Sequence, residues 1–203
     1  MDRNLIAGLT SNEVRSAVAE RFGMVATTPD ARFPFPVGRA FAEAIGYPAA
    51  VLDRLPTAVV ASFAGAACLS PWYGDWTGLT IADLGCGAGL DSLLLSEVVG
   101  PLGQVVGVDL STRMAFVATE NARNASRTNT TFCSAAVEAL PLCSASVDVA
   151  VANGVFNLSP EKARAVGEVH RVLRPGGELV GAEIVLQWEL PADQGNAMED
   201  WFC

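Results

Sequence analysis

The chain has 203 residues, of which 51% are hydrophobic and 17% are charged, a balance that excludes a disordered chain and predicts one compact domain with an extension. Its formal net charge of −9 repels nucleic-acid phosphates and anionic membrane surfaces, so neither is an expected partner. The sequence holds no run of ~18 uncharged apolar residues and no basic segment leading into an apolar one, so we expect a cytoplasmic protein.

The first 78 residues predict a helical cap that would cover a substrate region. Thr10 and Glu13 have the spacing of a capping box, which starts a helix running through Phe22. The prolines of segment 33–36 exclude a helix there, because each fixes its own backbone and pushes the preceding residue toward extended geometry. Gly and Pro then punctuate three short helices, expected over 37–45, 48–54 and 57–65.

From residue 79 to residue 187, apolar strand patterns alternate with helical ones. The expected strands cover 79–84, 104–108, 129–134, 147–152 and 178–187. The expected helices cover 89–99, a segment capped by Ser111, and 160–173 with Ser159 as its N-cap. Such alternation predicts an α/β fold, a Rossmann-like doubly wound parallel sheet, with 188–203 as a C-terminal tail.

A glycine-rich loop joins the first strand of this sheet to its first helix. Gly85 and Gly87 let a ligand approach the backbone closely, and the following helix directs its N-terminal dipole at the same crevice. Asp83 precedes the loop, where it would repel a pyrophosphate and attract an ammonium group. Asp109 stands 20 residues beyond Gly89, the usual distance for an acid that binds a ribose diol. An amino-acid head joined to a ribose describes S-adenosylmethionine better than NAD, which is kept as an outside alternative.

Residues 79–187 resemble the class I S-adenosylmethionine-dependent methyltransferases. The resemblance lies in Asp83–Gly89, Asp109, Val137–Leu142, Ser146–Val149 and Val169–Gly177, in family order and at family spacing. It implies S-adenosylmethionine as cofactor and a methyl transfer that needs orientation of donor and acceptor more than a general base. The cofactor-binding residues it implies are Asp83, Gly85, Cys86, Gly87, Asp109, Leu110, Val137, Glu138 and Asn153. Ala136 departs from the family, because many relatives have an acid there that accepts from the adenine amino group.

A narrower resemblance is to the arsenite methyltransferases, in the segments 46–48, 52–56, 68–71 and 153–162. These enzymes hold trivalent arsenic on cysteine thiolates, because a soft ion prefers sulfur ligands. The resemblance makes Cys68, Cys203 and Asn153 the catalytic candidates, with Cys68 and Cys203 as arsenic ligands and no other metal site. The family's middle cysteine falls on Gly154, and Phe22 stands where relatives often have a tyrosine.

The remaining three cysteines, Cys86, Cys133 and Cys143, are far apart and never in a Cys-x-x-Cys pair, which argues against a disulfide framework or a structural zinc site. Two further functions stay open: methylation of a small organic acceptor, as in quinone or sterol relatives, and cofactor binding without catalysis. Class I relatives add two more strands that no residues after Gln187 would supply. The resulting open sheet edge favours a homodimer.

Overall fold

The computed structural model describes residues 9–185 and has an α/β fold. The strands are β1 (Thr80–Leu84), β2 (Gln104–Asp109), β3 (Thr130–Ser134), β4 (Val147–Asn153) and β5 (Leu173–Ala182). The helices are α1 (Ser11–Thr27), α2 (Arg39–Ala44), α3 (Ala49–Leu52), α4 (Thr57–Ala61), α5 (Leu90–Val99), α6 (Thr112–Asn124) and α7 (Lys162–Val172), with 3-10 turns η1 (Ser70–Trp72) and η2 (Phe156–Leu158). No helix in residues 9–185 has the length and apolar character that a membrane span needs.

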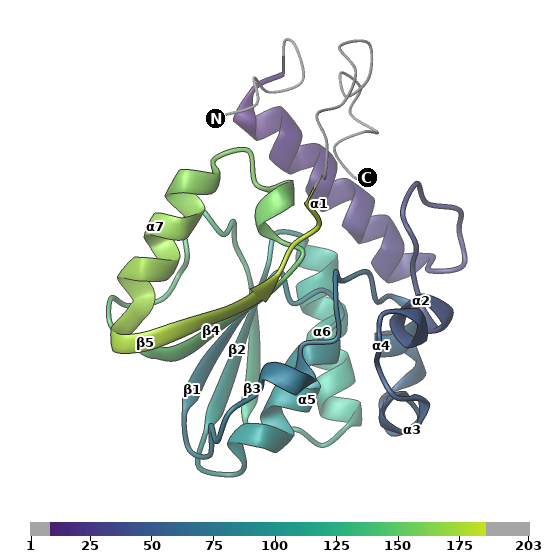
Figure 1. Ribbon diagram of the computed structural model, residues 1–203. Helices are drawn as coiled ribbons and strands as arrows, with labels where there is room; N and C mark the ends of the chain where they lie inside the picture. The colour runs from purple at the N-terminus through teal and green to yellow at the C-terminus, as the bar shows by residue number, and fades with distance from the viewer. Residues whose placement is uncertain (1–8, 186–203) are drawn as a thin grey trace.

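All five strands are parallel, in the order β3-β2-β1-β4-β5 (Figure 1). The central strand β1 is an almost continuous apolar run and is buried on both faces, as parallel sheets require. Ile81 packs with Leu95 and Val99 of α5 on one face. Ala82 and Leu84 belong to the opposite face, which α7 covers. The predicted doubly wound parallel sheet is therefore confirmed.

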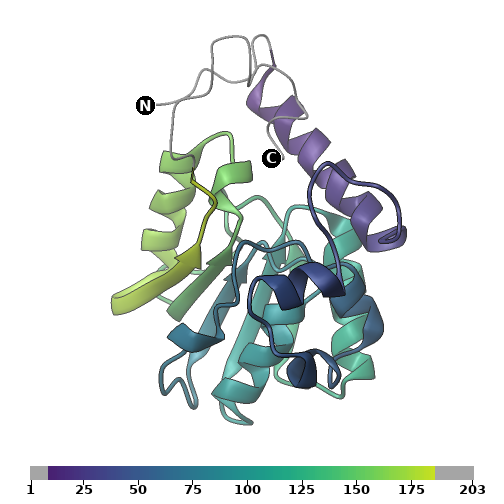
Figure 2. The same ribbon diagram turned by 45° about the vertical axis from the view of Figure 1, so that its right-hand side comes forward.

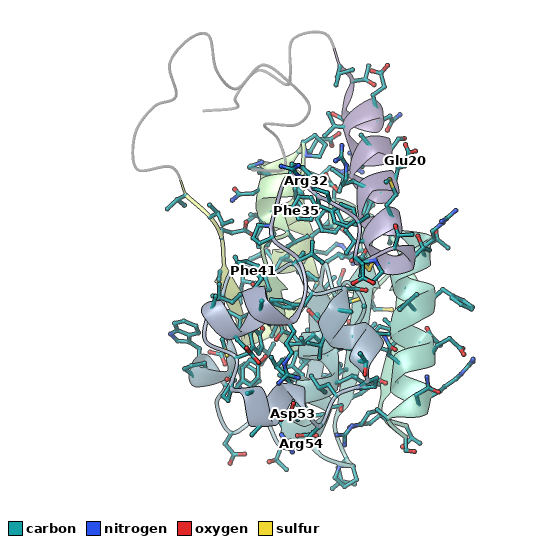
Figure 3. All side chains as sticks on the ribbon, turned by 90° about the vertical axis from the view of Figure 1, so that its right-hand side faces the viewer. Glu20, Arg32, Phe35, Phe41, Asp53 and Arg54 are labelled. Carbon is teal, nitrogen blue, oxygen red and sulfur yellow. The ribbon has the colours of Figure 1, made fainter. Side chains whose placement is uncertain are left out.

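The cap lies beside the carboxyl edge of the sheet. Helix α1 begins with the predicted capping box, in which the Glu13 N–H donates to Thr10 Oγ1 and the Thr10 N–H donates to Glu13. It runs beyond the strand ends, next to α6 and opposite α7 (Figures 1 and 2). Figure 3 views the cap from outside, with Phe41 on α2 and with Asp53 and Arg54 directly after α3. Helices α2 to α4 pack on α5, so this part of the cap is fixed to the α5 side of the sheet.

Several predicted boundaries are wrong, including that of the helix expected over 57–65, which ends at Ala61. The helix expected over 160–173 begins at Lys162, with Glu161 as N-cap. The Ser159 oxygen accepts from the Glu161 N–H at 3.2 Å, which lies before the first helical residue, and its hydroxyl donates to Glu138. The strand expected over 178–187 begins at Leu173 and ends at Ala182. Leu173 pairs with Val147 and Glu178 with Val149, so the intervening residues form a bulge within β5. The predicted tail, 188–203, lies outside the described residues.

Candidate functional site

A cleft of about 1030 Å³, counted to its open mouth, lies between α1 and the carboxyl ends of β1, β2 and β4. This is the place where open α/β sheets bind ligands, because the winding direction of the chain reverses there. The nine residues expected to bind a cofactor come from four separate segments, and all of them line this cleft: Asp83, Gly85, Cys86, Gly87, Asp109, Leu110, Val137, Glu138 and Asn153.

The glycine-rich loop forms the wall of the cleft between β1 and α5. The Gly85 and Cys86 N–H groups donate to the Val108 carbonyl at 2.8 and 3.1 Å, which fastens the loop to β2. Gly85 has φ +69°, and a Cβ there would lie 2.9 Å from Val155 Cβ. A Cβ on Gly87 would meet no atom within 4 Å, so this residue borders open space. The loop is therefore held from behind while its front remains accessible to a ligand.

Of the four buried carboxyl groups that line the cleft, three form no salt bridge within residues 9–185: those of Asp83, Asp91 and Asp109. Burial, followed by the charge of Asp91, raises the pKa of Asp83 to about 7. Burial raises the pKa of Asp109 to about 6, against the backbone N–H groups of Ser111 and Gly87 that favour its charged form. Burial also raises the pKa of Asp91. Because a cation would offset the cost of these charges, the cleft favours a positively charged ligand.

Asn153, at the end of β4, fastens the segment before Cys68 to the sheet. Its Oδ1 accepts from the N–H groups of Ala66 and Ala67 at 2.7 and 3.1 Å. Its Nδ2 donates to the Ala67 carbonyl and to Asp91 Oδ2, both at 2.8 Å. The donor and acceptor groups of the Asn153 side-chain amide thus hold the cap segment against the cleft.

Tyr47 and Tyr73 complete this buried network, and the spacing of sequence motifs did not predict their role. Their hydroxyls donate to Asp91 Oδ1 at 2.6 and 3.5 Å. Burial, followed by the charge of Asp91, raises the pKa of both tyrosines, so they remain neutral donors. The one available signal was that Tyr47 belongs to the 46–48 segment quoted above for the narrower resemblance.

Near the end of β3, the cleft is lined by the acid Glu138 and by Arg15. Within residues 9–185, Arg15 is the only basic side chain in the cleft lining. Glu138 is 4% exposed and accepts from the Ser159 hydroxyl at 2.6 Å. Arg15 reaches in from α1, with Nη1 3.6 Å from Glu138 Oε1 and 3.2 Å from Glu161 Oε1. The sequence placed Glu138 in the site, but it did not predict Arg15 or Ser159.

A family model described as a methyltransferase domain matches residues 76–202, more than half of the chain. The chain belongs to this methyltransferase family. Within it, the chain is placed among the class I S-adenosylmethionine-dependent methyltransferases, close to the arsenite methyltransferases, as the sequence motifs predicted. The cofactor of the family is S-adenosylmethionine, whose ammonium and sulfonium charges fit a cleft lined by three uncompensated carboxyl groups.

The names of the relatives state different methyl acceptors, arsenite in some and demethylmenaquinone in others. An arsenite methyltransferase of Halobacterium salinarum is 40% identical over 57% of this chain and 30% of its own length. A demethylmenaquinone methyltransferase of Lactococcus lactis is 38% identical over 54% of this chain and 44% of its own. A solved arsenic(III) S-adenosylmethionine methyltransferase from Chlamydomonas reinhardtii has a TM-score of 0.59 at 32% identity, covering 78% of this chain and 52% of that one. The chain thus spans less than half the length of the two curated relatives.

The cysteines of the methyltransferase occupy different environments. Cys68 is buried beside Tyr47 and Phe63, with Sγ 3.2 Å from Ser70 Oγ, and it does not line the cleft. Cys86 does line it, and burial, followed by the charge of Asp109, raises the pKa of its thiol well above the usual value. Cys203 lies outside the described residues. A Cβ on Gly154, where the family's middle cysteine falls, would lie 3.7 Å from Ala66, close to the segment that carries Cys68.

The side of the cleft that faces α1 and α4 is apolar. Its lining side chains include Val18, Phe22, Val59, Phe63 and Leu158. No histidine lines the cleft within the described range. This side therefore offers a bound ligand mainly apolar contacts.

Proposed function

We propose that the protein transfers a methyl group from S-adenosylmethionine to trivalent arsenic, with Cys68 as one thiolate ligand. The observation that carries the proposal is the Asn153 network, which holds the segment leading to Cys68 against the cofactor cleft. The relatives named for arsenic methylation support it. Cys203 remains the second candidate ligand.

When bound, S-adenosylmethionine would supply an electrophilic methyl carbon to which the lone pair of trivalent arsenic donates, with S-adenosylhomocysteine as the leaving group. The chain's own residues then have limited tasks. Asp83 and the glycine-rich loop hold the amino-acid end of the cofactor, and Asp109 accepts from the ribose hydroxyls. Phe22 and Phe63 exclude water from the acceptor side. Asn153 orients the cap segment that leads to Cys68. The transfer itself needs no general base, because the lone pair of trivalent arsenic carries no proton.

We propose that binding of the methyl acceptor and binding of the cofactor are divided between two parts of the chain. Residues 1–78 form the acceptor-side cap, and 79–187 form the cofactor-binding part. This division places Phe22, Phe63 and Cys68 on the acceptor side and the glycine-rich loop on the cofactor side.

The test is incubation with S-adenosylmethionine, excess thiol and either arsenite or methylarsonous acid, followed by separation of arsenic species and mass spectrometry. Cys68→Ser should abolish methylated product. The matched control is Cys143→Ser, because Cys143 is an exposed thiol that does not line the cleft. Full activity of Cys68→Ser would contradict the proposed ligand, and Cys203→Ser tests the second candidate in the same way.

A second acceptor class, a small quinone-like molecule, is favoured by a different observation. The acceptor side of the cleft is apolar, and the Cys68 sulfur does not line it. A reduced short-chain demethylnaphthoquinone is the matching substrate, and its methylation should be insensitive to Cys68→Ser. Tight binding of S-adenosylhomocysteine without turnover of either acceptor would instead favour a cofactor-binding homologue that lacks catalysis.

A further inference from the structure

Asp91 is a buried acid that faces both the cofactor cleft and the cap. It lies in the first turn of α5, directly after the glycine-rich loop, is 6% exposed and lines the cleft. Its charge contributes to the raised pKa of Asp83, so the two carboxyl groups act on the same part of the cleft. An acid in this turn stabilises the helix dipole, but an exposed carboxylate would do so without the cost of burial. The burial of Asp91 therefore needs another explanation.

Three donors from other elements converge on Asp91. Its Oδ1 accepts from the Tyr47 hydroxyl at 2.6 Å and from the Tyr73 hydroxyl at 3.5 Å. Its Oδ2 accepts from Asn153 Nδ2 at 2.8 Å. Burial raises the pKa of Asp91, and these three hydrogen bonds act against burial. The arrangement suits a carboxylate, because protonation would put a donor where a donor already points.

The partners of Asp91 also hold the segment that leads to Cys68. The Ala67 carbonyl accepts from Asn153 Nδ2 at 2.8 Å, and the Tyr47 hydroxyl lies 3.3 Å from the same oxygen. Asn153 Oδ1 accepts from the Ala67 N–H at 3.1 Å. Cys68, the next residue, does not line the cleft. A ligand in the cleft can therefore act on Cys68 only through the residues that hold this segment.

A cation in the cleft would strengthen that hold. The cofactor of the family carries ammonium and sulfonium charges, and a nearby cation favours the ionised form of a carboxyl group. Hydrogen bonds to an ionised acceptor are stronger than those to a neutral one. Occupation of the cleft thus tightens the contacts of Tyr47 and Asn153 with Asp91, and with them the segment before Cys68.

We propose that Asp91 is a positioning residue that transmits occupation of the cofactor cleft to the acceptor side, so that the segment carrying Cys68 is fixed when the cofactor is bound. The cofactor then binds before the acceptor. The inference rests on the proposed function in one respect, namely that Cys68 belongs to the acceptor side. Because coupling between two sites is reciprocal, loosening the segment should weaken cofactor binding by the same factor.

The experiment measures alkylation of each cysteine by iodoacetamide, with and without saturating S-adenosylmethionine, and resolves the sites by mass spectrometry. The cofactor should slow alkylation of Cys68 by about fivefold or more. Cys86 lines the cleft and reports occupancy directly, while Cys143 is exposed and should react equally in both states. A merely structural role of Asp91 would change the Cys68 rate equally with and without ligand, so the ratio of the two rates isolates the coupling.

Asp91→Asn should bring the Cys68 ratio close to one while Cys86 stays protected. Tyr47→Phe keeps the carboxylate and should lower the Cys68 ratio part of the way, which keeps the test decisive if Asp91→Asn does not fold. The matched control is Asp30→Asn, an exposed acid outside the cleft lining, whose ratio should equal that of the wild type.

A wild-type Cys68 ratio near one, or an unchanged ratio in Tyr47→Phe, would overturn the coupling. Loss of Cys86 protection in folded Asp91→Asn would make Asp91 a binding group and overturn its positioning role. None of these results depends on the methyl acceptor, so a failure of arsenic methylation is recognised separately by the product assay described above.

Discussion

Lowering the pH should weaken cofactor binding, because the cleft must present an ionised Asp83 to a cation. The pKa of this carboxyl group is raised to about 7, chiefly by burial. It is then about nine-tenths ionised at pH 8 and about one-tenth ionised at pH 6, so affinity should fall about tenfold over this range. Asp109, with a pKa of about 6, adds about a further factor of two at pH 6.

The assay is calorimetric titration of S-adenosylhomocysteine at pH 6, 7 and 8 and at constant ionic strength. Asp83→Asn should bind more weakly at pH 8 and lose most of the pH dependence, leaving about the twofold change expected from Asp109. Asp30→Asn is the matched control, because Asp30 is exposed and does not line the cleft. A wild-type affinity that stays within a factor of two from pH 6 to pH 8 would refute the reasoning.

Four further outcomes are expected. The free protein should melt at a higher temperature at pH 5.5 than at pH 8, because the three cleft carboxyl groups have pKa values above their unfolded ones and protonation favours the folded state; scanning calorimetry that shows the reverse would contradict this. Asn153→Ala should cost about 2 kcal/mol in unfolding free energy and speed amide exchange at Ala66 and Ala67, with unchanged exchange as the contrary result. Gly85→Ala should abolish cofactor binding in a titration, whereas Gly78→Ala, which has a similar φ but open space around it, should only lower the melting temperature. Light scattering after gel filtration should show a dimer formed through the β5 edge, which no strand within residues 9–185 covers, and a purely monomeric peak would exclude it.

The sheet could be predicted because its signals are local. The apolar runs of β1 and β4 and the glycine-rich loop between β1 and α5 are readable from neighbouring residues alone. The bulge in β5 could not be predicted, because it arises from pairing with β4, which the sequence does not encode within β5 itself. The start of α7 was placed too early, because Ser159 and Pro160 have the local pattern of a helix start, whereas the Ser159 oxygen accepts from the Glu161 N–H before the helix begins. The contact of the Ser159 hydroxyl with Glu138, 21 residues away, could not be predicted from local sequence.

The candidate site likewise contains residues that local motifs predicted and residues that depend on partners far away in the sequence. Motif order identified nine residues that the structure brings into one cleft, since motifs at strand ends meet at the same edge of a parallel sheet. Arg15 and Tyr47 were missed because their partners lie 146 and 44 residues away along the chain. The motif around Cys68 fixed its place in the chain but not the direction of its thiol, which packing against Tyr47 and Phe63 determines.

The connection between β3 and β4, residues 135–146, also limits how this protein can be redesigned. It runs from the edge strand β3 to β4, crossing β2 and β1, which is about 14 Å of sheet width. Arg171 of α7 holds it by donating to the carbonyls of Leu140 and Leu142. Because the same stretch carries Glu138, a change of its length would disturb strand order and ligand wall together. Altered ligand preference at this wall therefore has to come from substitutions at constant length, while insertions belong in the loops of the cap.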